Sequence, residues 1–165
     1  GFRMNKQAIY PGSFDPFTLG HLDIVTRALK IFDHIYIAIG ENKSKTTLFS
    51  VKEREAQISE IFKENSRITV TVFDELLVNF AKKINVFTVI RGLRAVSDFE
   101  FEFQMALTNR VIEPEFESIF FMTSEKYSFL SSSIVKEIAS KSDTELSQFI
   151  TPNVEKELRK KFKCI

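Results

Sequence analysis

Three short stretches of the sequence contain residue types that bind phosphate. The first, residues 10–21, reads Tyr-Pro-Gly-Ser-Phe-Asp-Pro-Phe-Thr-Leu-Gly-His and joins a predicted strand to a predicted helix. Free backbone N–H groups at such a helix start would face an anion. Gly20 allows a ligand to approach the backbone closely, and His21 adds an imidazole in the first helical turn. The alternative is an ordinary Pro/Gly turn before a histidine, but the whole run favours phosphate binding.

The second stretch contains two arginines, Arg91 and Arg94, separated by Gly-Leu at the end of a predicted buried strand. Guanidinium groups in such a position are costly unless they meet anions, and they match phosphate with two hydrogen bonds. The alternative is a pair of structural salt bridges to Asp98, Glu100 or Glu102. The glycine between the arginines favours phosphate binding.

The third stretch follows the fifth predicted strand and contains Ser131, Ser132 and Ser133. Serine hydroxyls and free N–H groups at a helix start suit an anion. By themselves, three serines are more often a helix cap in a polar loop. Their expected position opposite the Gly-His loop favours a place in the same site.

Five strand-sized runs position these stretches, at residues 7–10, 34–39, 68–73, 86–90 and 118–122. A segment with helical apolar spacing follows each run; in the first, Leu22, Val25 and Leu29 recur at steps of three and four residues. The alternation predicts an α/β fold, a single-domain Rossmann-like doubly wound five-stranded parallel sheet with helices on both faces. Ligands of such sheets bind beyond the carboxyl ends of the strands, where all three stretches are expected.

Helix starts are predicted from capping residues. Ser50 with Glu53, and Ser97 with Glu100, fit the capping box, in which each side chain satisfies a free backbone donor near the other. Thr151, followed by proline, is expected to cap the last helix.

Length and composition indicate one soluble domain over residues 1–165, with 44% hydrophobic and 27% charged residues. The longest apolar runs are strand-sized, so we expect no membrane partner and a cytoplasmic location. A net charge of +1 gives little reason to expect nucleic acid, and the basic residues 159–163 are expected to complement the dipole of the last helix. Cys164 cannot form an internal disulfide, which favours a reducing compartment. Met4 is a candidate natural start, preceded by three added residues.

Residues 10–21 resemble the Thr/His-x-Gly-His signature of the nucleotidylyltransferase superfamily, whereas the Walker A and dinucleotide-binding patterns are absent from the sequence. With Ile-Arg-Gly-Leu-Arg and Ser-Ser-Ser-x-Val-Lys-Glu in this order, the sequence is similar to the bacterial phosphopantetheine adenylyltransferase family over about residues 7–163. The resemblance implies transfer of AMP from ATP to 4′-phosphopantetheine, giving dephospho-coenzyme A and pyrophosphate in coenzyme A biosynthesis. It also implies Mg²⁺ bound with ATP, a homohexamer, and coenzyme A as feedback inhibitor.

The resemblance further implies site residues. His21 would stabilise charge on the α-phosphate, Lys45 would pair with the phosphates of both substrates, and Arg91 would contact the pantetheine end of the site. A lone lysine in the polar loop 41–47 would otherwise be a solvated surface residue. The implied acceptor-binding residues are Ser13, Lys45, Leu77 and Arg91. The implied ATP-binding residues are Ser13, Phe14, His21, Gly92, Leu93, Arg94, Glu102, Tyr127, Ser128, Phe129, Leu130, Ser131, Ser132 and Ser133.

The implied reaction is a direct in-line displacement without a covalent enzyme intermediate. A phosphate monoester is already a nucleophile near neutral pH, so the protein has to align substrates and neutralise charge. No protein ligand for a metal is expected; Asp15 is expected to stabilise its own turn, and His34 to be a bystander. Two alternatives are another transferase of the superfamily, acting on nicotinate mononucleotide, a cytidylyl acceptor or FMN, and a non-catalytic nucleotide-binding domain.

Overall fold

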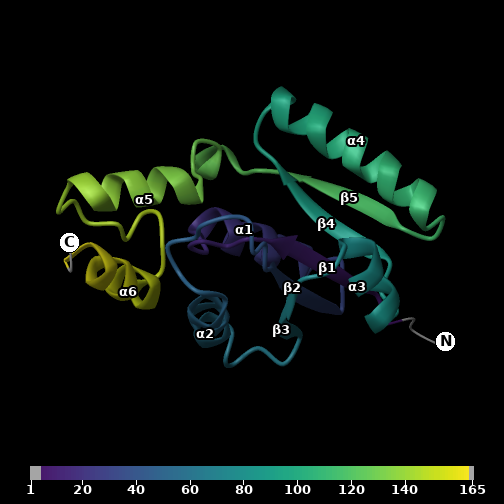
Figure 1. Ribbon diagram of the computed structural model, residues 1–165, viewed down its shortest axis with the longest axis horizontal. Helices are drawn as coiled ribbons and strands as arrows, with labels where there is room; N and C mark the ends of the chain where they lie inside the picture. The colour runs from purple at the N-terminus through teal and green to yellow at the C-terminus, as the bar shows by residue number, and fades with distance from the viewer. Residues whose placement is uncertain (1–4, 164–165) are drawn as a thin grey trace.

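The computed structural model describes residues 5–163, so Met4 and Cys164 lie outside the described residues, as do the side chains of Val96 and Ser97. The strands are β1 (Gln7–Gly12), β2 (His34–Gly40), β3 (Ile68–Phe73), β4 (Thr88–Leu93) and β5 (Glu117–Met122). The helices are α1 (Leu19–Ala28), α2 (Val51–Ile61), α3 (Leu77–Ile84), α4 (Val96–Ile112), α5 (Ser132–Lys141) and α6 (Pro152–Lys163), with a 3₁₀ turn η1 at Glu125–Tyr127 (Figure 1).

The strands form one parallel sheet in the order β3-β2-β1-β4-β5, which confirms the predicted fold. The chain moves outward from β1 to β3 and then returns to the other side of β1, so the strand order reverses between β1 and β4. These two strands pair at Ile9 and Val89, near their amino ends. Their carboxyl ends therefore border the crevice in which doubly wound sheets bind ligands.

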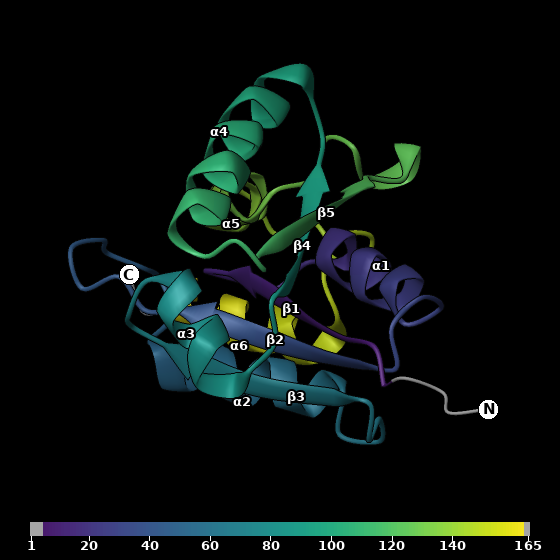
Figure 2. The same ribbon diagram turned by 90° about the vertical axis from the view of Figure 1, so that its right-hand side faces the viewer.

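Helices cover both faces of the sheet, as predicted (Figure 2). One core contains α1 and α2 residues, such as Val25 and Ile58, packed with the strand residue Ile37. The core on the opposite face is formed around α3, where Val78 and Ala81 are almost completely buried. Helix α4 lies along β4 and β5 (Figure 1).

A third core joins the carboxyl-terminal helices to the rest of the molecule. Leu130 and Val135 from the α5 region pack with Leu158 of α6 and with Phe49 from the loop before α2. The first residue of α1 is tied to the same region, because the N–H of Leu19 donates to the carbonyl of Phe149 at 2.8 Å. This core therefore positions the start of α5 beside the start of α1.

The predicted boundaries of the fourth strand were wrong. Strand β4 begins at Thr88, and its register continues through Arg91 and Leu93, which pair with β5. Val86 instead lies just beyond α3, where its N–H donates to the carbonyl of Ala81 at 3.1 Å. Arg91 is consequently a strand residue, and only Arg94 follows the strand.

Two of the three predicted helix starts are confirmed. Ser50 and Glu53 form the capping box, at 3.0 and 3.1 Å, and α6 begins directly after Thr151. The box at Ser97 was wrong, because α4 begins at Val96 with Ala95 as N-cap residue and no side-chain cap. Among residues 5–163, the helices are too short or too polar to cross a membrane.

Candidate active site

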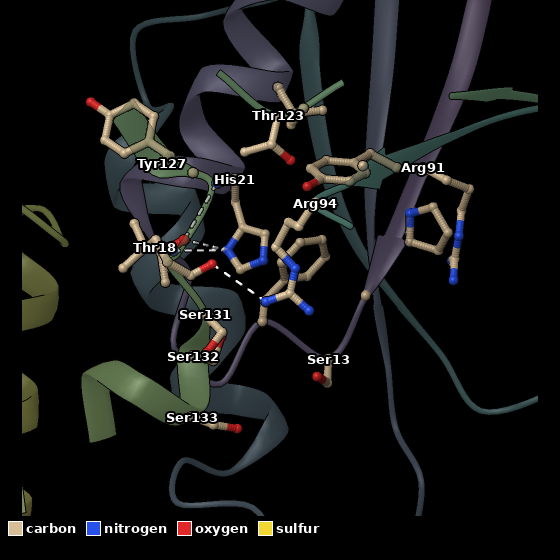
Figure 3. Close-up of a pocket in the computed structure, with 18 of the residues that line it drawn as sticks. Ser13, Thr18, His21, Arg91, Arg94, Thr123, Tyr127, Ser131, Ser132 and Ser133 are labelled. Carbon is tan, nitrogen blue, oxygen red and sulfur yellow. Dashed lines mark hydrogen bonds between the residues drawn. The ribbon is translucent and has the colours of Figure 1, made fainter. Parts of the chain in front are cut away.

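A cavity of about 420 Å³ lies at the carboxyl ends of β1 and β4 (Figure 3). It is bounded by the β1–α1 loop, the start of α1, the end of β4, and the segment between β5 and α5. The predicted site residues that line it are Ser13, Phe14, His21, Arg91, Gly92, Arg94, Glu102, Tyr127, Leu130, Ser131, Ser132 and Ser133. The structure thus brings residues from all three predicted stretches into one cavity.

His21 forms part of the N-terminal cap of α1. The N–H of Thr18 donates to Nδ1 of His21 at 2.9 Å, and the Thr18 hydroxyl oxygen lies 3.1 Å from the same nitrogen. In the other direction, the N–H of His21 donates to that hydroxyl at 3.4 Å. Histidine thus takes the position that Glu or Gln usually occupies in a capping box.

Aromatic rings surround the His21 imidazole. The ring centroids of Phe14, Phe17 and Tyr10 lie 5.0, 5.2 and 6.4 Å from that of His21. Burial lowers the pKa of His21 to about 4, and the positive charge of Arg94 contributes in the same direction. The imidazole is therefore neutral at physiological pH.

Both arginines of the second stretch are in the salt bridges that the alternative interpretation predicted. Arg91 binds Glu102 through two hydrogen bonds, with Nε–Oε2 and Nη2–Oε1 distances of 2.6 and 2.8 Å. Arg94 contacts Asp98 at 3.3 Å and the carbonyl of Leu130 at 3.4 Å. Both guanidinium groups also line the cavity, so the two interpretations are compatible. The Arg94 side chain is more exposed than that of Arg91, at 44% against 28%.

Asp15 does not stabilise its own turn as predicted. Its buried carboxylate accepts hydrogen bonds from the N–H groups of Leu48 and Phe49, both at 2.9 Å, and from Nζ of Lys136 at 3.0 Å. It therefore joins three segments, the β1–α1 loop, the loop before α2, and α5. Two main-chain donors and one cation compensate the desolvation of this carboxylate.

A second buried side chain supports the β1–α1 loop. Arg54 is 3% exposed, and its Nη1 donates to the carbonyl of Ser13 at 2.7 Å while Nε donates to Phe49 at 3.2 Å. At the end of β1, a Cβ on Gly12 would lie 2.8 Å from the buried Phe14 ring, so a larger residue there would displace that ring. These contacts fix the main chain of Ser13 at the edge of the cavity.

The three serines serve both as a helix cap and as cavity lining. Ser131 is the N-cap residue of α5 and accepts a hydrogen bond from the N–H of Ile134 at 3.2 Å. The Ser132 hydroxyl donates to the carbonyl of Pro16 at 2.7 Å, which ties the start of α5 to the β1–α1 loop. All three line the cavity, so the N-terminus of α5 borders it. The predicted helix cap and the predicted place in the site are therefore both present.

Two predicted residues line neighbouring hollows. Lys45 is exposed in the loop after β2, and its hollow shares Ser13 with the main cavity. Leu77 lines a mainly apolar cavity of about 110 Å³, which shares Arg91 and Glu102 with the main cavity. The three spaces are therefore adjacent.

Three predicted residues lie outside the lining of these spaces. The carbonyl of Leu93 accepts hydrogen bonds from the N–H and the hydroxyl of Thr123, at 2.9 and 2.8 Å. The Ser128 hydroxyl donates to Glu125 at 2.9 Å, and the exposed Phe129 ring contacts Phe149 edge-on. The Leu93 carbonyl, the Ser128 hydroxyl and the Phe129 ring thus make contacts within the segments around the cavity.

Sequence reasoning missed several residues of the site: Ile24 and Thr123 line the cavity, and Arg54 and Lys136 anchor its loops. Tyr10 and Thr18 also line the cavity; they belong to the first predicted stretch, but neither was given a role of its own. Thr18 was recognisable as an N-cap type three residues before His21. The anchoring pairs connect positions 41 and 121 residues apart, so no local pattern identifies them.

Comparisons with known proteins place this geometry in a family. Residues 9–138 match the model of the cytidylyltransferase-like family. A phosphopantetheine adenylyltransferase of Caldanaerobacter subterraneus is 51% identical over 96% of this chain and 98% of its own. The enzyme of that name from Geobacter metallireducens is 48% identical over 95% and 96% of the two chains. The chain belongs to the phosphopantetheine adenylyltransferase family.

Solved structures show the same fold at much lower identity. A nicotinic acid mononucleotide adenylyltransferase from Plasmodium falciparum, in complex with NaAD, superposes with a TM-score of 0.63 at 17% identity, covering 98% of this chain and 96% of its own. A bifunctional NMN adenylyltransferase/ADP ribose pyrophosphatase from Francisella tularensis gives 0.64 at 16% identity, covering 95% and 49%. At this identity the likeness concerns the fold alone. This member of the phosphopantetheine adenylyltransferase family thus shares its fold with other nucleotidyltransferases.

Proposed function

We propose that this protein transfers AMP from ATP to 4′-phosphopantetheine, releasing pyrophosphate and forming dephospho-coenzyme A. The observation that carries the proposal is the position of His21, neutral and capped, in a cavity that also holds two arginines and the serine-rich start of α5. Near-complete alignment with relatives that bear this enzyme's name supports the choice of substrates.

In this proposal, the main cavity and the apolar cavity beside Leu77 hold different parts of the two substrates. Backbone donors and hydroxyls at the start of α5, together with Ser13, Phe14 and Arg94, suit the triphosphate. Tyr127 and Leu130 suit the adenine, and Gly92 allows close approach of the nucleotide. The apolar cavity beside Leu77 suits the pantetheine arm.

Catalysis would rest on alignment and charge stabilisation. An oxygen of the acceptor phosphate attacks the α-phosphorus in line with the departing pyrophosphate. Nε2 of His21 hydrogen-bonds the α-phosphate as negative charge develops, and Lys45 and Arg91 hold the acceptor. Phosphate already carries the attacking electron pair, so the reaction needs neither a general base nor a covalent enzyme intermediate.

Mg²⁺ would accompany ATP and be bound mainly by phosphate oxygens and water. Within residues 5–163, no group of three or more His, Cys, Asp or Glu could hold a metal ion. Asp15 is engaged by two N–H groups and Lys136. We further propose that the protein forms a homohexamer and is inhibited by coenzyme A. It would be cytoplasmic and consist of a single domain over residues 1–165.

The proposal is tested by measuring pyrophosphate release from ATP and Mg²⁺ with 4′-phosphopantetheine as acceptor. Plain pantetheine, which lacks the phosphate, and the variant His21→Ala are the controls. We expect release only with the phosphorylated acceptor, dephospho-coenzyme A as product, and a fall of about 10²–10³ in kcat for His21→Ala. A folded protein that binds ATP but releases no pyrophosphate with this acceptor would contradict it, and a screen of other phosphorylated acceptors would then identify a sister transferase.

A further inference from the structure

We infer that Thr18 is a positioning residue that holds His21 as the neutral tautomer with its hydrogen on Nε2, so that His21 acts on the reacting phosphate as an uncharged hydrogen-bond donor. The inference rests on the proposed function for the role of the phosphate. The assignment of the ring hydrogen is independent of that function, because it follows from the cap of α1 alone.

The main chain fixes the ring hydrogen. A backbone N–H can only donate, and the N–H of Thr18 lies 2.9 Å from Nδ1 of His21. Nδ1 must therefore present its lone pair, which places the hydrogen of a neutral ring on Nε2. An imidazolium would carry a second hydrogen on Nδ1, directed at the hydrogen of the Thr18 N–H. The cap thus selects against both the other tautomer and the cation.

The Thr18 hydroxyl supports the same arrangement from the side chain. Its oxygen lies 3.4 Å from the N–H of His21, from which it accepts, and 3.1 Å from Nδ1, to which its hydrogen can be donated. Thr18 is 2% exposed, so little water competes for these contacts. Figure 3 shows the imidazole held by Thr18 on one edge, with its other edge toward Arg94 and the cavity.

The surroundings of the ring also disfavour a positive charge. Phe14 and Phe17 pack beside the imidazole. The titratable groups that line this cavity from other elements are Tyr10 of β1, Tyr127 of η1, Arg94, and the mutually paired Arg91 and Glu102. Burial, followed by the charge of Arg94, lowers the pKa of His21. Geometry and surroundings therefore favour the same protonation state.

A neutral Nε2–H donor has a defined chemical consequence. It stabilises the developing charge by a hydrogen bond, as neutral histidine does in other enzymes, but it does not deliver a proton to pyrophosphate. The unit Nδ1=Cε1–Nε2–H presents an acceptor, one carbon and a donor, which is also the order of atoms in a glutamine amide. Glutamine at this position would thus reproduce both contacts, whereas glutamate would keep only the acceptor.

The tautomer is tested directly by NMR of the full chain labelled with ¹⁵N-histidine, without substrates. Protonated and unprotonated ring nitrogens have well-separated ¹⁵N shifts, and the only other histidine, His34, is assigned with the variant His34→Gln. We expect the His21 ring to carry hydrogen on Nε2 alone at pH 7 and to remain neutral at pH 5.5. A hydrogen on Nδ1, or a charged ring at pH 5.5, would overturn the inference while leaving the proposed reaction untouched.

The donor role is tested with the pair His21→Gln and His21→Glu. Both residues fit a capping box, so both variants should fold, which circular dichroism checks. We expect kcat of His21→Gln to exceed that of His21→Glu and of His21→Ala by on the order of tenfold or more, with little pH dependence between pH 6 and 8. Equal kcat values for glutamine and alanine, in folded variants that still form the product, would contradict an uncharged donor.

The positioning role is tested with Thr18→Val, which keeps the shape of the side chain, and Thr18→Ser, which keeps the hydroxyl. We expect Thr18→Val to lower kcat about tenfold with a smaller change in the KM for ATP, and Thr18→Ser to restore most of it. The ¹⁵N shifts of His21 should change in Thr18→Val and return in Thr18→Ser. A loss of stability without any change in kcat or in these shifts would show a structural role only.

Discussion

Two groups of residues around the cavity, an anchored side and an open side, differ in how firmly their side chains are held. On the anchored side, which comprises Asp15, Thr18 and His21, every residue is hydrogen-bonded to main-chain groups, and Asp15 and Thr18 are buried. On the open side, which comprises Lys45 and Arg94, the side chains are exposed. The group proposed to act on the reacting phosphate is thus fixed before substrates bind, whereas Lys45 and Arg94, two of the cations proposed to bind phosphates, stay exposed.

This difference has a physical reason. A hydrogen-bond donor stabilises a transition state most when it needs no rearrangement, so His21 gains from a rigid cap. Lys45 and Arg94 are exposed, so binding a polyanion does not require them to leave a buried salt bridge. The open side also leaves room for two substrates to enter, and for product to leave.

The largest effect should come from breaking the anchored side at Asp15. Asp15→Ala leaves two buried N–H groups and the Lys136 ammonium without their acceptor, so we expect the free energy of unfolding to fall by about 3 kcal/mol or more. Urea unfolding measures it, with the exposed Asp143→Ala as the control. A fall below about 0.5 kcal/mol would mean that Asp15 does not join the three segments.

The next largest effect should be a pH dependence of the free energy of unfolding that arises from His21. The unfolded ring titrates near 6.5 and the folded ring near 4, so between these values the unfolded state binds more protons and stability falls as pH falls. From pH 7 to pH 5 we expect a loss of about 2 kcal/mol that is absent in His21→Gln. Equal losses in the two proteins would place the pKa of folded His21 near its ordinary value.

Substitution on the open side should affect binding and not stability. For Lys45→Met we expect the KM for 4′-phosphopantetheine to rise about tenfold, because an exposed cation that meets phosphate contributes about 1.4 kcal/mol. The melting temperature should stay the same, since Lys45 is in an exposed loop. Lys52→Met, which removes an exposed lysine of α2 outside the three hollows, is the matched control. A KM like that of the control would remove Lys45 from the site.

The smallest effect should come from Arg94→Lys. Lysine keeps the charge but not the planar fork, so we expect the KM for ATP to rise roughly threefold with kcat almost unchanged. Steady-state kinetics at constant ionic strength measures this, with Arg110→Lys, on the exposed far end of α4, as the control. If kcat fell by the same factor as for His21→Ala, the separation between the anchored and open sides would be wrong.

The sequence was sufficient to predict the fold and most of the cavity, because hydrophobic periodicity and loop motifs are local signals. Residues such as His21, Arg91 and Ser132 could be placed near the carboxyl edge of the sheet from the sequence alone. The anchoring contacts of Arg54 and Lys136 could not, because they join distant segments and leave no spacing pattern. The end of β4 was misplaced because Arg91 and Gly92 resemble a loop, although pairing with β5 keeps them in the strand.

The contacts between the β1–α1 loop and the carboxyl-terminal third also bear on the order of folding. Ser132 reaches Pro16 across 116 residues, Lys136 reaches Asp15 across 121, and Phe149 binds the N–H of Leu19. Closing such long loops is slow, and it occurs only after the distant segment has been synthesised. The first four strands end by Leu93, so they can pair before the contacts that hold the β1–α1 loop are made. During synthesis on the ribosome, the nascent chain would acquire its architecture first and its activity last.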